Sequence, residues 1–153
     1  MFESCLKKQQ KIKEAFASCQ SSNKSAEASY EKIIDLGKRL PRLASSLKTE
    51  ENLVKGCQSA TYLKARLEGD VVFFKGESDA FISNGLLALL LAVYNKETPE
   101  TILKCKPTYL TELNISTSLT PGRANGLAAI YLRIKQEALK LFLMQKPKRK
   151  ETS

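Results

Sequence analysis

The absence of histidine makes the cysteine thiols the first candidates for chemistry in this chain. Its 153 residues include four cysteines and no histidine. The usual general base, the Ser-His and Cys-His catalytic pairs and the commonest metal ligand are therefore all missing. The four cysteines form no CxxC pair, which excludes zinc ribbons and thioredoxin-type redox motifs: Cys5, Cys19, Cys57 and Cys105. Each of the four thiols must therefore be judged on its own.

Cys57 has the most unusual expected surroundings of the four cysteines. It lies between Gly56 and Gln58, at a turn between two short β-rich runs, which would leave the thiol exposed or in a shallow pocket. We expect the other three to be small buried hydrophobic residues, as most free cysteines are. Position alone does not decide between a reactive and a structural role for Cys57, because no base accompanies it.

Two junctions between a loop and a helix could favour an anion such as a thiolate or a persulfide. They are residues 76–79 (GESD) and 119–126 (LTPGRANG), and the backbone N–H groups at a helix N-terminus attract negative charge. Local pattern favours ordinary capping, with Ser78 or Asp79 as the cap of the first helix. Arg123 lies in a first helical turn, where it opposes the helix dipole, so we expect it to have a specific partner such as a carboxylate.

The elements that must position these residues follow from apolar spacing. Two amphipathic helices are expected before Pro41, and the apolar run Gly85–Val93 predicts a buried helix. Thr98 and Thr120 each precede a proline, a pattern typical of a helix start.

The middle third of the chain is rich in β-forming residues. Three short runs predict strands: 52–55, 59–67 and 71–77. A compact link at Gly69 makes the last two a hairpin. The sequence therefore predicts an α+β fold, with a small antiparallel sheet of about three strands packed against several helices. We expect one domain over residues 1–145 and a basic, disordered tail over residues 146–153.

The net charge of +9 invites a nucleic-acid interpretation. Part of the excess lies in the tail sequence KPKRKE at 146–151, which carries four positive charges and one negative. No aromatic residues are interleaved with this run, as they are in many nucleic-acid binding segments. We therefore expect no nucleic-acid partner, and a basic RNA-associated protein is the alternative that charge alone would favour.

No segment predicts secretion or membrane insertion. The N-terminal lysines are not followed by an apolar stretch of the kind found in signal peptides. The longest apolar run, Gly85–Val93, is far shorter than the roughly 20 residues of a membrane-spanning helix. We expect a cytoplasmic protein without a membrane partner, in a reducing compartment where free thiols persist.

An ordered series of short motifs runs from about Ser25 to Leu139. Its members are IIDLGKRLP at 33–41, VKGCQS at 54–59, GESDA at 76–80, GL at 85–86, ALL at 88–90, Tyr94, Thr98-Pro99, LTP at 119–121, Arg123 and NGL at 125–127. In order and spacing this series resembles the SufE family of sulfur-acceptor proteins. Two departures are Tyr62, where many members have tryptophan, and Gly122, where serine is usual.

The resemblance implies a persulfide carrier for iron-sulfur cluster assembly. The cysteine that matches Cys57 accepts sulfane sulfur from a SufS-type cysteine desulfurase, stimulates that enzyme and passes the sulfur to a downstream iron-sulfur scaffold complex. The family fold is α+β. The resemblance implies no metal and no resident cofactor, since the pyridoxal phosphate belongs to the desulfurase, and it leaves a homodimer open. Such a chain is a sulfurtransferase-type carrier rather than an independent turnover enzyme.

Five residues around Cys57 are predicted to support its chemistry. We hypothesise that Arg123, together with Lys55, supplies positive potential near the sulfur, and that Asp79 holds Arg123 in place. Gly56 would give the loop freedom to shelter the thiol and then swing out. This hypothesis predicts a Cys57 that is partly buried in the free protein; Gln58 completes the set as its neighbour.

An iron-sulfur cluster scaffold-like protein is the alternative that the shared fold allows. A scaffold needs about three cysteine or histidine ligands that converge on a metal. The chain offers one thiol in the expected place and no imidazole. The sequence does not name the particular desulfurase or the downstream acceptor, nor does it assign roles to the other three thiols.

Overall fold

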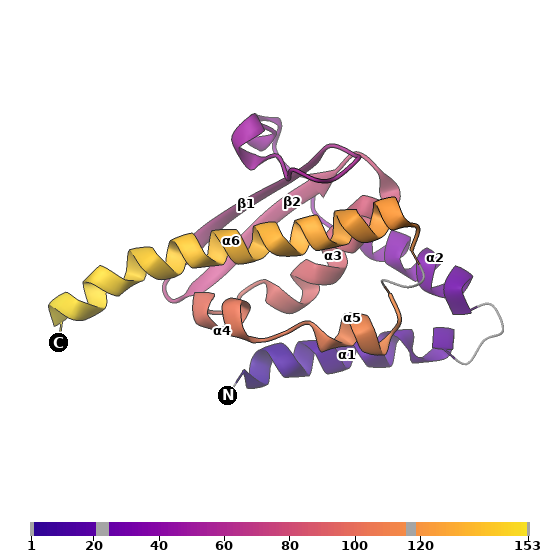
Figure 1. Cartoon of the computed structure of the whole chain (residues 1–153), viewed down its shortest axis with the longest axis horizontal. Coiled ribbons are helices and arrows are strands. Elements are labelled where there is room, and N and C mark those ends of the chain that lie inside the picture. Colours follow the sequence, from indigo (N-terminus) through magenta and orange to yellow (C-terminus); the bar gives the residue numbers. More distant parts are fainter. Residues whose placement is uncertain (1, 21–24, 116–118, 153) are drawn as a thin grey trace.

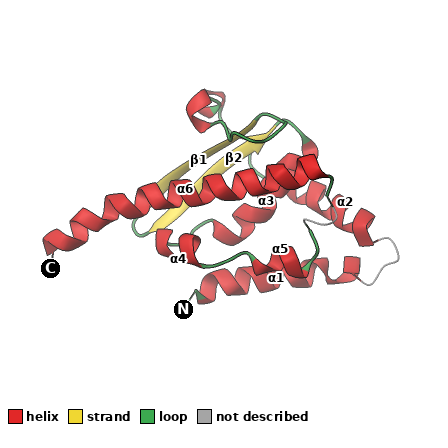
Figure 2. Ribbon diagram, viewed as in Figure 1, coloured by secondary structure: helices red, strands yellow, loops and turns green. Residues whose placement is uncertain are grey.

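The computed structural model describes residues 2–20, 25–115 and 119–152 (Figure 1). It contains the helices α1 (Glu3–Gln20), α2 (Ser25–Lys38), α3 (Phe81–Tyr94), α4 (Pro99–Lys104), α5 (Thr108–Glu112) and α6 (Pro121–Thr152), the strands β1 (Thr61–Glu68) and β2 (Val71–Ser78), and two short 3-10 turns at Ser45–Leu47 and Glu50–Asn52. Helices therefore pack against one small antiparallel sheet (Figure 2), which confirms the predicted α+β class.

The sheet is one hairpin, and the expected third strand does not form. Strands β1 and β2 pair in register from Thr61 with Ser78 to Glu68 with Val71. Gly69 occupies the first central position of the turn with a φ of +60°, a conformation that glycine adopts without strain. The run at 52–55 contributes a single bridge, between Leu53 and Tyr62, because the chain turns away at residues 55–56.

Two of the three predicted helix caps are confirmed. The Thr98 hydroxyl accepts a hydrogen bond from the Thr101 amide at 3.2 Å, and the Thr120 hydroxyl accepts one from the Arg123 amide at 3.4 Å. The cap expected from Ser78 or Asp79 is wrong: α3 begins after Ala80, which makes no side-chain cap bond.

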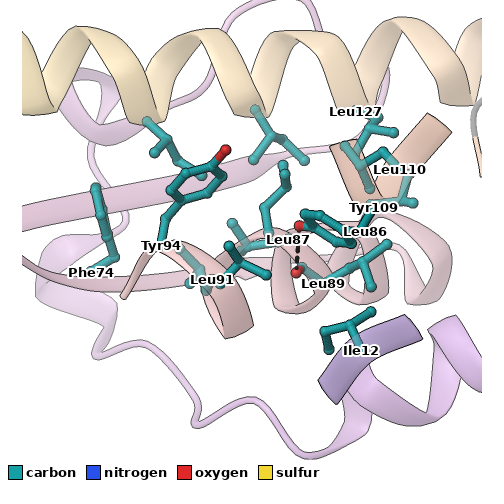
Figure 3. Close-up of a cluster of buried hydrophobic side chains, with 14 of the residues drawn as sticks. Ile12, Phe74, Leu86, Leu87, Leu89, Leu91, Tyr94, Tyr109, Leu110 and Leu127 are labelled. Atoms are coloured by element: carbon teal, nitrogen blue, oxygen red, sulfur yellow. Dashed lines mark hydrogen bonds between the residues drawn. The ribbon is translucent and has the colours of Figure 1, made fainter. Parts of the chain in front are cut away.

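Helix α3 is the centre of the hydrophobic core, as its uniformly apolar sequence predicts (Figure 3). It packs against α2, the sheet and α6. Gly85 allows the close approach of α2, since a Cβ atom there would lie 2.2 Å from the Ile33 carbonyl oxygen. Two buried tyrosines brace the core by donating hydrogen bonds, from Tyr94 to the Cys105 carbonyl at 2.7 Å and from Tyr109 to the Leu89 carbonyl at 3.0 Å.

Helix α6 runs across the whole molecule and contacts α3, α4 and β1 (Figure 1). Its buried stripe includes Leu127, Ile130, Ile134 and Ala138. The predicted boundary at residue 145 stays a prediction, because the side chains of residues 146–153 lie outside those described. None of the helices in the described ranges combines the length and the apolar character that spanning a bilayer demands.

Candidate functional site

Cys57 follows a tight turn that only glycine adopts easily. Lys55 and Gly56 form the turn, and Gly56 has a φ of +97°, in the left-handed region that strains other residues. A Cβ atom on Gly56 would also lie 3.1 Å from the Ala129 Cβ atom of α6. The sequence pattern suggested a glycine that frees the loop. The geometry shows a glycine that the sheltered conformation itself requires.

Hydrogen bonds hold both ends of the Cys57 loop. The Val54 amide donates to the Thr61 carbonyl at 2.7 Å. At the other end the Asp79 amide donates to the Ala60 carbonyl at 3.1 Å, and the Asp79 carboxylate accepts from the Ala60 amide at 3.1 Å. Asp79 therefore fixes the C-terminal end of the loop through Ala60, and it does not cap a helix. Residues 55–59 form the loop between the Val54–Thr61 hydrogen bond and the Asp79–Ala60 hydrogen bonds.

The Cys57 thiol is half-buried and lies at a small pocket, which agrees with the expected partial burial. The sulfur is 3.7 Å from the Gly126 carbonyl oxygen, to which the thiol donates. The pocket has a volume of about 290 Å³ and is lined by the loop and by the first turns of two helices: Cys57, Gln58 and Ser59, then Ala80, Ile82 and Ser83, then Gly122, Arg123 and Gly126. Because α3 and α6 both begin at this pocket, the positive ends of two helix dipoles face the pocket.

Burial sets the protonation of the thiol. It raises the pKa of Cys57 above its ordinary value, and a hydrogen bond with the Thr61 hydroxyl acts in the opposite direction. Desolvation disfavours the thiolate, so the free protein holds Cys57 as a thiol at neutral pH. The charges of Arg123 and Lys55 are not among the influences on this pKa in the observed conformation.

A cluster of hydroxyl groups lies beneath the Cys57 loop, and sequence reasoning missed it. Ser59 bonds to Ser83 at 2.8 Å and to Ser78 at 3.2 Å, while Thr61 donates to Ser78 at 2.9 Å. These bonds join the loop, both strands and α3. The alternation of β1 would have placed Thr61 on the buried face, but nothing local indicates that the four hydroxyl groups meet.

Gln58 covers the beginning of α6. A Cβ atom on Gly122 would lie only 2.9 Å from the Gln58 Oε1 atom, so the Gln58 side chain occupies the space that glycine leaves. This contact closes the loop over one side of the pocket. Gly122, a departure from the usual serine, thus has a direct structural consequence at the site.

Arg123 lines the Cys57 pocket, but its partner is not the expected carboxylate. Its guanidinium carbon lies 5.1 Å from the centroid of the Tyr30 ring of α2, within the range of a cation–π contact. Among the described residues no ion pair joins Arg123 to Asp79. The sequence offered no signal for Tyr30, because 93 positions separate it from Arg123.

Lys55 lies outside the Cys57 pocket. Its side chain is exposed and lines a separate groove with Glu50, Glu51, Leu132 and others. Of the predicted site residues, Cys57, Gln58 and Arg123 therefore line the same pocket. Gly56 forms the turn before Cys57, and Asp79 fixes the far end of the loop. Lys55 lies outside the pocket.

Arg133 holds the segment that leads into the loop, a role that sequence analysis missed. From α6 it donates to the Leu53 carbonyl at 2.8 Å and to the Glu51 carbonyl at 2.6 Å. Glu137, one helical turn away, accepts from its Nε atom at 3.0 Å and fixes its orientation. The i, i+4 spacing of Arg133 and Glu137 was visible in the sequence, but the carbonyl groups were not.

The other three cysteines are buried, as predicted: Cys5, Cys19 and Cys105. The Gln9 side-chain amide lies 3.8 Å from the Cys5 sulfur and 3.5 Å from the Cys105 sulfur. Burial, more than any other influence, raises the pKa of Cys5 to about 12, so this thiol is not ionised near neutral pH. Within the described ranges no three Cys, Asp or Glu side chains gather to hold a metal ion.

The sequence of this chain is similar to those of known proteins. A family model described as "SufE: Fe-S metabolism associated domain" matches residues 10–138. An uncharacterized SufE-like protein of Synechocystis sp. is 36% identical over 116 residues, covering 76% of this chain and 73% of the relative. One of Rhizobium etli is 36% identical over 114 residues, covering 71% and 77%.

A solved structure shares the fold. The solution structure of a hypothetical protein from Thermus thermophilus superimposes with a TM-score of 0.71 at 22% identity, covering 89% of this chain and 96% of the other. At that identity the likeness concerns the fold alone.

Proposed function

The chain belongs to the SufE family, which is associated with Fe-S metabolism, and from this premise we propose that Cys57 is a persulfide carrier for iron-sulfur cluster assembly. The observation that carries the proposal is the half-buried Cys57 thiol at a pocket on which two helix N-termini converge. The donor is a SufS-type cysteine desulfurase, which this chain stimulates by accepting its sulfur. The receiver is a downstream iron-sulfur scaffold complex in the cytoplasm.

The transfer is an exchange between a thiolate and a persulfide. The Cys57 thiolate attacks the outer sulfur of the donor persulfide, a new S–S bond forms on Cys57, and the donor S–S bond breaks. The donor cysteine leaves with the bonding electron pair as a thiolate and takes up the proton that Cys57 lost. No external oxidant or reductant enters. The pyridoxal phosphate stays with the desulfurase, and this chain needs no cofactor for the step.

The raised pKa of Cys57 makes its thiol a weak nucleophile in the free protein. A thiol that is protonated and half-buried reacts slowly with electrophiles and protects a bound persulfide from reductants. Docking of the donor must therefore expose the sulfur or favour its thiolate. Arg123 is the cation that lines the pocket, so its charge can act on the sulfur when the loop moves.

The test compares the wild type with the Cys57→Ser variant in the presence of a SufS-type desulfurase and cysteine. We expect the wild type to stimulate desulfurase turnover and to gain the mass of one sulfur atom on the peptide that contains Cys57. Cys57→Ser should do neither, while Cys19→Ala, a change at a buried thiol, should behave as the wild type. Stimulation that survives in Cys57→Ser, or an adduct on another cysteine, would contradict the proposal.

The scaffold alternative has less support. It needs about three convergent cysteine or histidine ligands, whereas Cys57 lies at the pocket and the other three thiols are packed in the core. Incubation with iron and sulfide separates the two functions, since a scaffold would acquire the visible absorbance of a cluster.

A further inference from the structure

Phe81 is the most exposed large hydrophobic side chain in the described part of the chain, with 75% of its surface open to solvent. Isolated exposed apolar residues are common and need no explanation, so its location is what matters. Phe81 is the first residue of α3, and its neighbours Ala80 and Ile82 both line the Cys57 pocket. Phe81 does not itself line the pocket, but its place between two lining residues puts it at the rim of the candidate reaction site.

Phe81 also borders a second hollow, next to the Cys57 pocket. This hollow has a volume of about 370 Å³ and is lined by Phe81 together with Ile34, Leu40, Lys38 and Arg42, among others. We call these five residues the docking face. Half-buried Ile34 and Leu40 provide an apolar floor, and the exposed Lys38 and Arg42 provide a positively charged edge.

The cations of the docking face are only partly balanced from within the chain: the carboxylates of Glu77 and Asp79 line the same hollow, and the charge of Arg42 contributes to the lowered pKa of Glu77. Lys38 and Arg42 form no ion pair in the part of the chain that the structure describes. The nearest carboxylates are already engaged: Glu77 accepts from the Leu43 amide at 2.7 Å and from Lys48 at 3.1 Å, which together hold its pKa below the ordinary value. Asp79 accepts from the Ala60 amide. The docking face therefore presents an aromatic ring beside an edge where the cations Lys38, Arg42 and Lys48 outnumber the carboxylates Glu77 and Asp79.

Sulfur transfer requires a partner that covers this rim. The donor sulfur must approach the Cys57 sulfur until a bond of about 2.05 Å can form. A macromolecule that reaches into the pocket between the loop and the first turn of α3 comes into contact with Phe81. Aromatic residues are over-represented among the side chains that dominate binding energy, because they bury much area and lose few rotamers.

We propose that Phe81, flanked by Lys38 and Arg42, is the anchor through which the sulfur donor docks, and that the matching surface of the donor is an apolar recess edged by carboxylates. This inference rests on the proposed function, since it takes the cysteine desulfurase as the occupant. Complementary charge around an apolar contact accelerates encounter and selects the partner.

The experiment measures binding separately from sulfur transfer. A SufS-type desulfurase is titrated by calorimetry with chains that all carry Cys57→Ser, so that no sulfur moves. We expect Phe81→Ala to weaken binding about tenfold or more, as truncation of an aromatic anchor does. Leu6→Ala is the matched control, because Leu6 is 51% exposed but lies on α1. It should leave binding unchanged.

Two charge-reversal variants, Lys38→Glu and Arg42→Glu, test the contribution of positive charge in the same titration. We expect each to weaken binding, and we expect added salt to weaken wild-type binding more than that of the reversed-charge variants. Phe81→Leu, which keeps an apolar contact, should bind more tightly than Phe81→Ala.

The outcomes distinguish this inference from the proposed function. If Phe81→Ala binds the desulfurase as tightly as the control while Cys57 still acquires sulfur in the wild type, the docking face is wrong and the carrier function stands. If the chain does not bind the desulfurase, the docking face is wrong as well. Binding through Phe81 without any adduct on Cys57 would support the docking face and overturn the carrier. Stronger binding by Lys38→Glu would contradict the acidic partner surface.

Discussion

The Cys57 sulfur is governed by two opposing influences that come from different parts of the chain. Burial in the pocket disfavours the thiolate, and the Thr61 hydroxyl favours it. Cys57 and Thr61 are four positions apart, but the loop folds back so that strand β1 begins beneath the sulfur. The Thr61 hydroxyl donates to Ser78 while Cys57 is a thiol, so it must turn toward the sulfur to stabilise the thiolate.

Replacing Thr61 should make Cys57 less reactive. Thr61→Val keeps the shape of the side chain but removes the hydroxyl, so the pKa of Cys57 should rise further. Because alkylation requires the thiolate, the pH profile of Cys57 alkylation should move to higher pH, and the rate at pH 7 should fall. Iodoacetamide labelling of the free protein, followed by mass spectrometry of the Cys57 peptide, measures both.

Thr61→Ser is the matched control, since it keeps the hydroxyl and should retain the wild-type profile. An unchanged profile in Thr61→Val would mean that the hydroxyl bond has no influence on the thiol. A rate that rises in both variants would instead indicate that the changes loosen the loop.

At the scale of elements, the loop at 55–59 is held by contacts with α6, an element that begins more than 60 positions later. Gln58 packs on Gly122, and Arg133 binds the carbonyl groups of Glu51 and Leu53. Both contacts join the segment around Cys57 to a long, well-packed helix. They are the features that a docking partner has to loosen if the loop is to open.

The contact between Gln58 and Gly122 should restrain the loop. In Gly122→Ala the new methyl group would meet the flexible end of Gln58, which can move aside at little cost in stability. We expect severalfold faster alkylation of Cys57 with an unchanged melting temperature. Ala128→Ser, an exposed change further along α6, is the control. The double variant Gly122→Ala/Gln58→Ala should alkylate at the same rate as Gln58→Ala alone, because the obstructed side chain is gone.

Arg133 should stabilise the segment before Cys57. Arg133→Met removes two charge-assisted hydrogen bonds to carbonyl groups, and we expect the free energy of unfolding to fall by about 2 kcal/mol. Urea denaturation measures this loss, and limited proteolysis should cut near residues 50–56 faster. Lys140→Met is the control, because the Lys140 side chain is 71% exposed. An equal loss in both variants would show that the carbonyl contacts contribute nothing specific.

At the scale of the whole molecule, α1 belongs to the same packed unit as the site, although its first turns precede the segment that the SufE model matches. Cys5 is fully buried in the core, and Lys8 pairs with the largely buried Glu97 at 2.6 Å. Ser4 donates to the same carboxylate at 2.8 Å. These contacts tie the N-terminal helix to the segment that follows α3.

Breaking the Lys8–Glu97 pair should leave a buried carboxylate without its main partner. We expect Lys8→Met to lower the free energy of unfolding by about 2 kcal/mol, since an uncompensated buried charge is strongly unfavourable. Lys8→Met/Glu97→Gln should recover part of this loss. Lys13→Met, at a pair whose Glu112 side chain is 50% exposed, should cost about 0.5 kcal/mol or less. Equal losses in the two single variants, measured by urea denaturation, would contradict this account.

Features that depend on neighbouring residues could be predicted from the sequence. Apolar periodicity located α1, α2 and the buried run Gly85–Val93 of α3, and the threonine-proline pairs located the starts of α4 and α6, but nothing predicted the short helix α5. The glycine at 69 located the hairpin turn, and the combination of a lone turn cysteine with an ordered motif series singled out Cys57. Each signal arises from backbone preference or from a repeating pattern within one element, so it can be read without knowing the fold.

Which side chains contact one another depends on the tertiary structure. The run at 52–55 had the composition of a strand, but Arg133 and the turn at Gly56 limit it to one bridge. Asp79 binds Ala60, and Arg123 binds the Tyr30 ring, instead of pairing with each other. The physical reason is that side-chain partners are chosen by packing between elements that lie tens of residues apart. Local composition does not encode that choice.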